Sequence, residues 1–269
     1  MLLAVEIDNA HINLGVFEDV SQSVLAKSFK VSTDINKTSD EYAVVLKGIF
    51  DYYGILPSHI DGAIISSVVP MLTETVRQAV FKLFGEIDTL VVGKGTKTGF
   101  PIKIDNPSEL GTDLVANAAA VIDIRKKENK LKTPCIIVDM GTATTVFALN
   151  AGGEYIGGCI IPGIGISLEV LHGKTAQLPN VALSAPTRAI GKNSAESVRS
   201  GVMLGNAIMI DGFIKKFSEE MESGEQTEVF VTGEYAEKVF PYCEHKVRYV
   251  PELTLTGLSC IYKNNIKDR

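Results

Sequence analysis

The chain has 269 residues, of which 45% are hydrophobic and 22% are charged, and its formal net charge is −6. These values are typical of a globular protein with one large or two modest domains. A negative net charge without a basic stripe argues against a nucleic-acid partner. Glu6 interrupts the N-terminal apolar run too early for a signal peptide or a membrane-spanning helix, so we predict a cytoplasmic protein without a membrane partner.

The residues that most often bind metals or form disulfides are scattered along the chain. The four cysteines form no C-x-x-C pair and are predicted to be buried thiols, and the four histidines suggest no metal cluster. Only His11 is of functional interest, because it lies beside the first predicted turn. The one short basic cluster, Arg125 to Lys127, is predicted to be a solvated helix end.

The first half of the chain alternates strand and helix patterns, which indicates an α/β sheet. Three strands are expected to form an antiparallel meander, and they are followed by a helix, a buried strand ending at Pro70, a second helix and another buried strand. In chain order these elements are expected at residues 2–6, 12–17, 24–31, 40–53, 62–69, 76–83 and 90–92.

A loop over residues 96–113 interrupts this periodicity, and helical spacing resumes at 114–124. We place a domain boundary here, with domains at residues 1–115 and 116–269. The second half then repeats the alternation of strands and helices. Its hairpin is expected at residues 135–149, its third strand at 155–161 and a further strand at 229–231. Its helices are expected at 164–171, 194–217, 234–240 and 253–262.

The second half opens with CIIVDMGTATTVFAL, which predicts a β-hairpin with Asp139 at its tip. Gly141 allows a close approach of the backbone to an anion, and Thr142, Thr144 and Thr145 offer hydroxyl and main-chain N–H donors. Asp139 can hold a cation against a bound phosphate. An ordinary hairpin with a polar tip is the alternative.

The N-terminus contains a second copy of this pattern, LAVEIDNAHINLGVF. Aligning Glu6 with Asp139 places Asp8 on Gly141, and Asn9 then falls on Thr142. The chain therefore carries the same acid-tipped hairpin twice, about half a chain apart.

Two such hairpins resemble the duplicated, ribonuclease H-like α/β fold of actin, sugar kinases and acetate kinase, in which each domain is a mixed sheet flanked by helices. Within that superfamily the chain resembles the type III pantothenate kinases, which include the Bvg accessory factor-like proteins. The segments that carry the resemblance are ISSVVP (65–70), DNPSELGTD (105–113), NAAA (117–120), DMGTATT (139–145), GGCIIPGIGISLE (157–169), TAQLP (175–179), IGKNSAES (190–197) and LTLTGL (253–258).

The resemblance implies ATP-dependent phosphorylation of pantothenate to 4′-phosphopantothenate, the first step of coenzyme A biosynthesis, by a homodimer that uses Mg²⁺ and a monovalent cation, K⁺ or NH₄⁺. Asp113 matches the proton acceptor of the family, and Asp139 and Glu6 match its metal-binding positions. The positions that match nucleotide contacts are Glu6, Ile7, Asp8, Asn9, Ala10, His11, Ile12, Asn13 and Thr142. Those that match pantothenate contacts are Ile104, Gly111, Thr112, Asp113, Leu114 and Ser194. A helix N-cap is the alternative role for Asp113.

Several positions depart from the family pattern, and they cluster in the expected site. Asp8 replaces a glycine, adding a carboxylate whose repulsion of a triphosphate could cost about 1–4 kcal/mol. Leu114 replaces an arginine that could bind a carboxylate bidentately. The remaining departures are Glu6 for aspartate, Ala10 for threonine, Ile104 for tyrosine, Phe147 for an acid, and Gly233-Glu234 for a glycine pair.

Three functions therefore stay open from the sequence. The first is an active pantothenate kinase, and the second is a kinase of the same family for a different, less acidic hydroxyl-bearing acceptor. The third is a weakly active or non-catalytic paralogue that binds a ligand and regulates. Release of ADP in the presence of pantothenate, ATP, magnesium and potassium would separate the first from the others.

Overall fold

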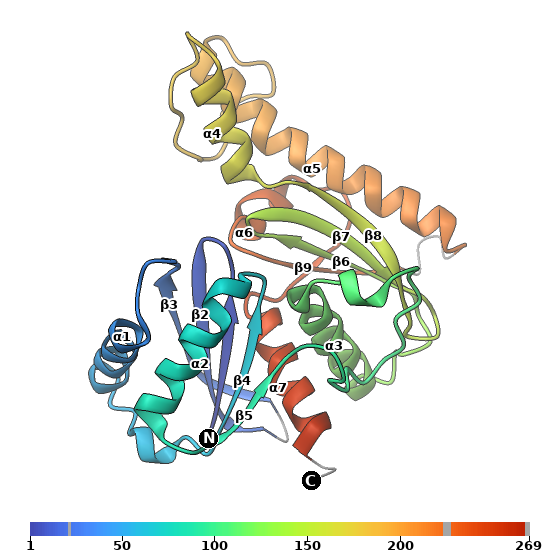
Figure 1. Ribbon diagram of the computed structural model, residues 1–269. Coiled ribbons are helices and arrows are strands. Elements are labelled where there is room, and N and C mark those ends of the chain that lie inside the picture. Colours follow the sequence, from blue (N-terminus) through green and yellow to red (C-terminus); the bar gives the residue numbers. More distant parts are fainter. Residues whose placement is uncertain (21–22, 223–226, 267–269) are drawn as a thin grey trace. The chain divides into compact units, whose positions relative to one another are not determined.

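The computed structural model describes residues 1–20, 23–222 and 227–266 (Figure 1). The chain forms two compact units, the first from Met1–Phe100, Asn106–Ile124 and Glu252–Arg269, and the second from Pro101–Asp105 and Arg125–Pro251. This division differs from the predicted continuous domains, because most of α3 (Thr112–Lys127) and all of α7 (Leu253–Ile266) belong to the first unit. None of the helices in the described residues has the length and apolar character that a membrane span requires.

The first unit contains a five-stranded mixed sheet with the strand order β3-β2-β1-β4-β5 (Figure 1). Strands β1, β2 and β3 form the predicted antiparallel meander, and β4 and β5 add to β1 in parallel. The strands span Leu2–Ile7 (β1), His11–Asp19 (β2), Val24–Ser32 (β3), Gly62–Ser67 (β4) and Asp88–Val91 (β5). The flanking helices α1 and α2 span Ser39–Tyr52 and Pro70–Phe84.

The alternation of side chains along β1 separates the two faces of this sheet. Leu3, Val5 and Ile7 pack into a hydrophobic core with residues of α1 and α2. Because neighbouring strand residues point to opposite faces, Glu6 lies on the other face, which α7 covers. The strand pattern thus buries an apolar face and leaves the one acid near the end of β1 on the opposite side.

The second unit repeats this sheet strand for strand, with the order β10-β9-β6-β7-β8. Its antiparallel meander is β6-β7-β8, and β9 pairs with β6 in parallel, as β4 pairs with β1. The strands span Cys135–Met140 (β6), Ala143–Leu149 (β7), Tyr155–Pro162 (β8), Glu228–Thr232 (β9) and Arg248–Tyr249 (β10). The predicted duplication is therefore confirmed. Strand β10 was not predicted, because two residues are too few to show a pattern.

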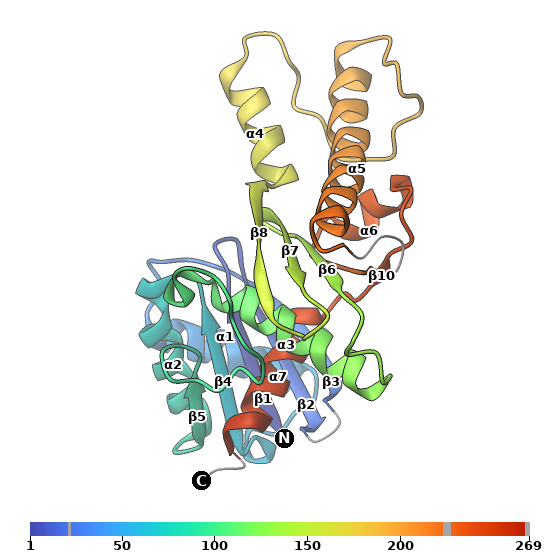
Figure 2. The same ribbon diagram turned by 90° about the vertical axis from the view of Figure 1, so that its right-hand side faces the viewer.

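Three helices accompany the second sheet: α4 (Ile164–Lys174), α5 (Ser194–Glu220) and the short α6 (Ala236–Val239). Helix α5 packs on β6 and β7, and α4 contacts both α5 and β7. The free end of α4 and the first turns of α5 extend beyond the ends of the strands (Figure 2). Short 3-10 turns complete the structure at Pro57–His59, Pro107–Glu109 and Phe240–Tyr242.

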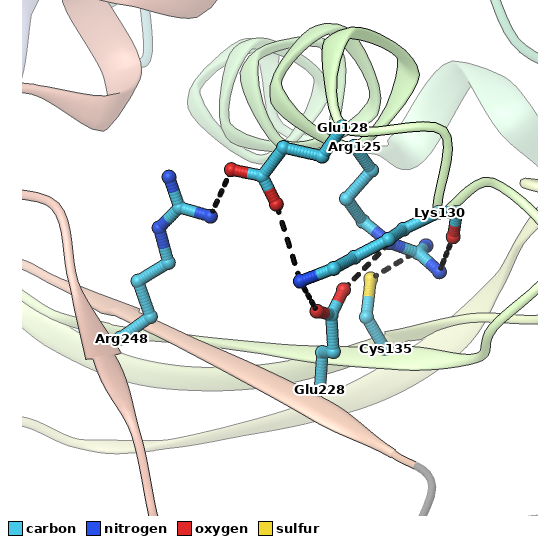
Figure 3. A network of polar contacts seen from close by, with 6 residues as sticks. All are labelled: Arg125, Glu128, Lys130, Cys135, Glu228 and Arg248. Atoms are coloured by element: carbon cyan, nitrogen blue, oxygen red, sulfur yellow. Dashed lines mark hydrogen bonds and ion pairs between the residues drawn. The ribbon is translucent and has the colours of Figure 1, made fainter.

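A network of polar contacts holds the end of α3 against β6 and β9 (Figure 3). Arg125 is fully buried and donates to Glu228 at 3.2 Å, to the main-chain oxygen of Lys130 at 2.7 Å and to Cys135 Sγ at 3.3 Å. Around this buried core, exposed ion pairs join Glu128 to Arg248 at 2.7 Å and Lys130 to Glu228 at 2.9 Å. The prediction of a solvated helix end is therefore wrong for Arg125.

Burial also decides the chemistry of the thiol in this network. It raises the pKa of Cys135 to about 12, although the neighbouring Arg125 opposes the shift. Cys135 is therefore an inert, protonated side chain at neutral pH. Cys135 and Cys260 are buried as predicted, whereas Cys159 and Cys243 are only partly buried.

Candidate active site

The first hairpin holds its acid in a row of polar residues. Glu6 is the second-last residue of β1, and in the strand ladder it lies between Asn13 of β2 and Ser66 of β4. Asn13 Nδ2 donates to Glu6 Oε2 at 3.0 Å. The carboxylate is therefore oriented by its neighbour on the adjacent strand rather than left to rotate.

The turn that follows, Asp8 to Ala10, already uses two of the amides that it would present to a phosphate. The Asp8 N–H donates to the main-chain oxygen of His11 at 2.9 Å, and the Asn9 N–H donates to Asp8 Oδ1 at 2.7 Å. Thr33 braces the turn from outside by donating its hydroxyl to the Asp8 main-chain oxygen at 2.6 Å. The Asn9 N–H is thus already bonded to the Asp8 carboxylate.

Asp113 lies in the first turn of α3, and the structure corrects its predicted alternative role as N-cap. Helix α3 begins at Thr112, and the Val115 N–H donates to the main-chain oxygen of Gly111, so the cap position belongs to Gly111. A Cβ on Gly111 would collide with Asp113 Oδ1, which shows that the carboxylate folds back over this glycine. Gly111 is therefore required for this orientation of Asp113.

The protonation of Asp113 is shifted by its surroundings. Burial raises the pKa of this carboxyl above its ordinary value, and the nearby Asp8 carboxylate raises it further. The backbone N–H groups of Leu114 and Asp113 itself lower the pKa and oppose part of the shift. The first unit therefore brings together the two predicted site segments, the hairpin turn and the start of α3.

The second hairpin repeats the arrangement with a shorter turn. Asp139 is the second-last residue of β6 and lies between Thr145 of β7 and Thr232 of β9. Two glycines pack directly on its turn: a Cβ on Gly163 would collide with the main-chain oxygens of residues 141 and 142, and one on Gly233 would lie 2.6 Å from Asp139 Oδ1. The backbone at Gly233 has a φ of 98°, which favours glycine.

The donor atoms present suit the cations that the sequence predicts. Within the described residues the Thr145 hydroxyl is buried without a hydrogen-bond partner, in the same row as Asp139, and a carboxylate with a hydroxyl suits a hard monovalent cation. The described residues contain no group of three His, Cys, Asp or Glu side chains able to hold a metal ion. Mg²⁺ in kinases usually takes only one or two carboxylates and completes its shell with phosphates, so the single carboxylate of Glu6 fits such a role.

The other predicted residues fall into different environments. The side chains of Ile7 and Ile12 belong to the hydrophobic core, so only their main-chain atoms can meet a nucleotide. Leu114 is 8% exposed, and Ile104 is half-buried beside Gly157 of β8. Ser194 is exposed at the start of α5, directly after the N-cap Asn193.

The remaining positions are accessible to a ligand to different degrees. Asn9 and Ala10 are exposed, and His11 and Thr142 are half-buried. Ser66 was not predicted as a site residue, and Thr145 was predicted only as one of the donors that the second turn offers to a phosphate. Each of these two residues places a hydroxyl near the end of a strand, paired with an acid on the neighbouring strand. This feature can be recognised only once the strand register is known.

The fold belongs to the class of actin-like and sugar-kinase proteins with two duplicated α/β domains. Similar solved structures include a Baf family transcriptional activator from Campylobacter jejuni, with a TM-score of 0.59 and 17% identity over 98% of this chain and 99% of that one. The activator of 2-hydroxyisocaproyl-CoA dehydratase from Clostridium difficile, with bound ADPNP, gives a TM-score of 0.55 and 12% identity over 100% and 97% of the two chains. At these identities the likeness concerns the fold alone.

Sequence comparison then gives the family. The type III pantothenate kinase family model matches residues 2–216. The type III pantothenate kinase of Moorella thermoacetica is 38% identical over 265 residues, covering 98% of this chain and 100% of that protein. That of Roseiflexus castenholzii is 39% identical over 265 residues, covering 98% and 99%. The chain belongs to the type III pantothenate kinase family.

Replacing Asp8 should strengthen nucleotide binding. Asp8→Gly removes both the carboxylate that takes the Asn9 amide and its repulsion of a triphosphate, so ATP should bind about 5-fold tighter or more, with the larger gain at low magnesium. Asp8→Asn removes the charge but keeps the Cβ, so it separates the effect of charge from the effect of size. Asp51 is exposed on α1, and Asp51→Asn controls for the change in net charge. Calorimetry that shows the native protein binding ATP without metal as tightly as Asp8→Gly would refute this explanation.

Proposed function

We propose that the protein transfers the γ-phosphate of ATP to the primary hydroxyl of pantothenate and so forms 4′-phosphopantothenate, the first step of coenzyme A biosynthesis. The observation that carries this proposal is the similarity to type III pantothenate kinases over nearly the whole chain. The half-buried Asp113 adds support, because its carboxylate lies over Gly111 and is hydrogen-bonded to the backbone of Leu114 and of Asp113 itself.

In this reaction the protein positions two substrates and gives one proton a destination. Asp113 accepts the proton of the pantothenate hydroxyl as that oxygen attacks the γ-phosphorus and the bond to the β,γ-bridging oxygen of ATP breaks. Its raised pKa makes it a stronger base than an ordinary aspartate. In the first unit we assign nucleotide contacts to residues 6–13, and in the second unit Thr142 is the position that matches such a contact.

The two hairpin acids are assigned to cations in this proposal. Glu6 would hold Mg²⁺, and Asp139 would hold a monovalent cation, K⁺ or NH₄⁺. Bound cations neutralise the charge that develops on the transferred phosphoryl group. The buried Thr145 hydroxyl beside Asp139 supports the second assignment. We place the reaction in the cytoplasm, where ATP is available.

We also propose a homodimer that forms through the second unit. Large apolar side chains are exposed on three elements of that unit, including Ile160 of β8 at 74%, Val170 of α4 at 52% and Ile208 of α5 at 71%. A second copy of the chain would remove such side chains from water. Sedimentation velocity at about micromolar concentration should show a dimer; a monomer there would remove this proposal.

Two observations favour a second candidate, a weakly active or regulatory paralogue. The Asp8 carboxylate already takes an amide of the turn that would bind phosphate, and the buried Leu114 offers no charge to a carboxylate. A protein of this kind would bind a ligand without appreciable turnover. A variant of the first proposal is a kinase that phosphorylates a different, less acidic acceptor. The apolar side chains of Leu114 and Ile104 would suit such an acceptor.

Asp113→Asn separates a catalytic from a structural role of this residue. Asparagine keeps the shape and the first-turn hydrogen bonds but cannot accept the proton, so kcat should fall about 10²–10⁴-fold while the unfolding transition stays unchanged. Turnover that survives in a correctly folded Asp113→Asn variant would show that Asp113 is structural.

The pH dependence of the native enzyme gives an independent check on Asp113. The carboxylate works only when ionised, so kcat should fall as the pH falls through its raised pKa, at a higher pH than for an ordinary aspartate. Asp8→Asn removes one of the causes of the shift and should move this acidic limb to lower pH. An acidic limb that does not move would mean that another group controls it.

A further inference from the structure

A chain of hydroxyl groups connects the end of the first sheet to the start of α3. Ser66 lies beside Glu6 in the strand ladder and is only 1% exposed. Its hydroxyl donates to the Thr112 hydroxyl at 2.8 Å, and Thr112 donates in turn to the main-chain oxygen of Ser67 at 3.3 Å. The first residue of α3 is therefore attached to the end of β4 by side-chain hydrogen bonds.

The rest of α3 in this unit is held by a different set of contacts. The Thr254 hydroxyl of α7 donates to Asn117 Oδ1 at 2.8 Å, and Gly257 approaches the main chain of Ala116 so closely that a Cβ would not fit. These contacts fix the helix one turn beyond Asp113. The contact between Ser66 and Thr112, by contrast, acts on the residue directly before Asp113.

We propose that Ser66 is a positioning residue for phosphoryl transfer: through the Thr112 hydroxyl it fixes the first turn of α3 and thereby the place of the Asp113 carboxylate. The proposal rests on the proposed function, in which Asp113 accepts the proton of the acceptor hydroxyl. A general base must lie within hydrogen-bond reach of that proton, and a misplacement of about 1 Å can lower a rate about 100-fold.

The neighbouring serine provides a matched control. The Ser67 hydroxyl donates to the Val69 main-chain oxygen at 3.0 Å and accepts from the Val69 N–H at 3.1 Å, in the turn before α2, while only its main chain meets Thr112. Ser66→Ala should lower kcat about 10-fold or more with the KM for ATP changed by less than about two-fold. Ser67→Ala should leave kcat unchanged. Equal effects of the two variants would overturn the proposal.

A double-mutant cycle tests whether Ser66 acts through Thr112. Thr112→Val removes the partner hydroxyl with little change of shape and should also lower kcat. If the two hydroxyls act through one hydrogen bond, Ser66→Ala/Thr112→Val should lose little more than the more damaging single variant. Losses that multiply would show that Ser66 and Thr112 act independently, which contradicts the proposal.

Amide hydrogen exchange provides a readout that needs no substrate. Exchange of the Val115 N–H, which bonds to Gly111, should be faster in Ser66→Ala than in the native protein and in Ser67→Ala. If the native protein does not phosphorylate pantothenate, the proposed function fails, and faster exchange would still support positioning of α3 by Ser66. If native turnover is present but Ser66→Ala matches the native protein in kcat and exchange, the proposal fails while the function stands.

Discussion

The strand register at the two hairpins is the constraint on which the site depends. In both sheets a parallel strand pairs with the first strand of the hairpin, so that the acid before the turn lies between two polar side chains: Asn13 and Ser66 around Glu6, and Thr145 and Thr232 around Asp139. A shift by one residue would turn each acid toward the hydrophobic core. The buried apolar residues on alternate positions of β1 and β6 therefore fix the chemistry as well as the stability.

The two hairpins have diverged in what their turns offer to an anion. The second turn is backed by Gly163 and Gly233, which let the backbone approach closely. The first turn carries Asp8, whose carboxylate takes the Asn9 amide and also raises the pKa of Asp113. In the proposed function, the Asp8 carboxylate would therefore repel the phosphates and also raise the pKa of the proposed base.

The sequence predicted the duplication, because each hairpin has its own apolar alternation and acid, and these are local patterns. It did not predict that Arg125 is buried, since a basic cluster at a helix end has the same pattern whether or not Glu228 lies opposite. It placed Asp113 at a helix start, but it did not show that the helix begins one residue earlier, at Thr112, with the Val115 N–H bonded to Gly111. The role of Ser66 needed the register of β4 against β1, which joins residues far apart in the chain.

The most direct test is a mass balance of the reaction. The native protein would be incubated with ATP, pantothenate, Mg²⁺ and K⁺, and both ADP and 4′-phosphopantothenate would be quantified by mass spectrometry. A pantothenate kinase forms the two products in equal amounts, and only when pantothenate is present. A folded protein that binds ATP but forms no 4′-phosphopantothenate, or that releases ADP independently of pantothenate, would contradict this account.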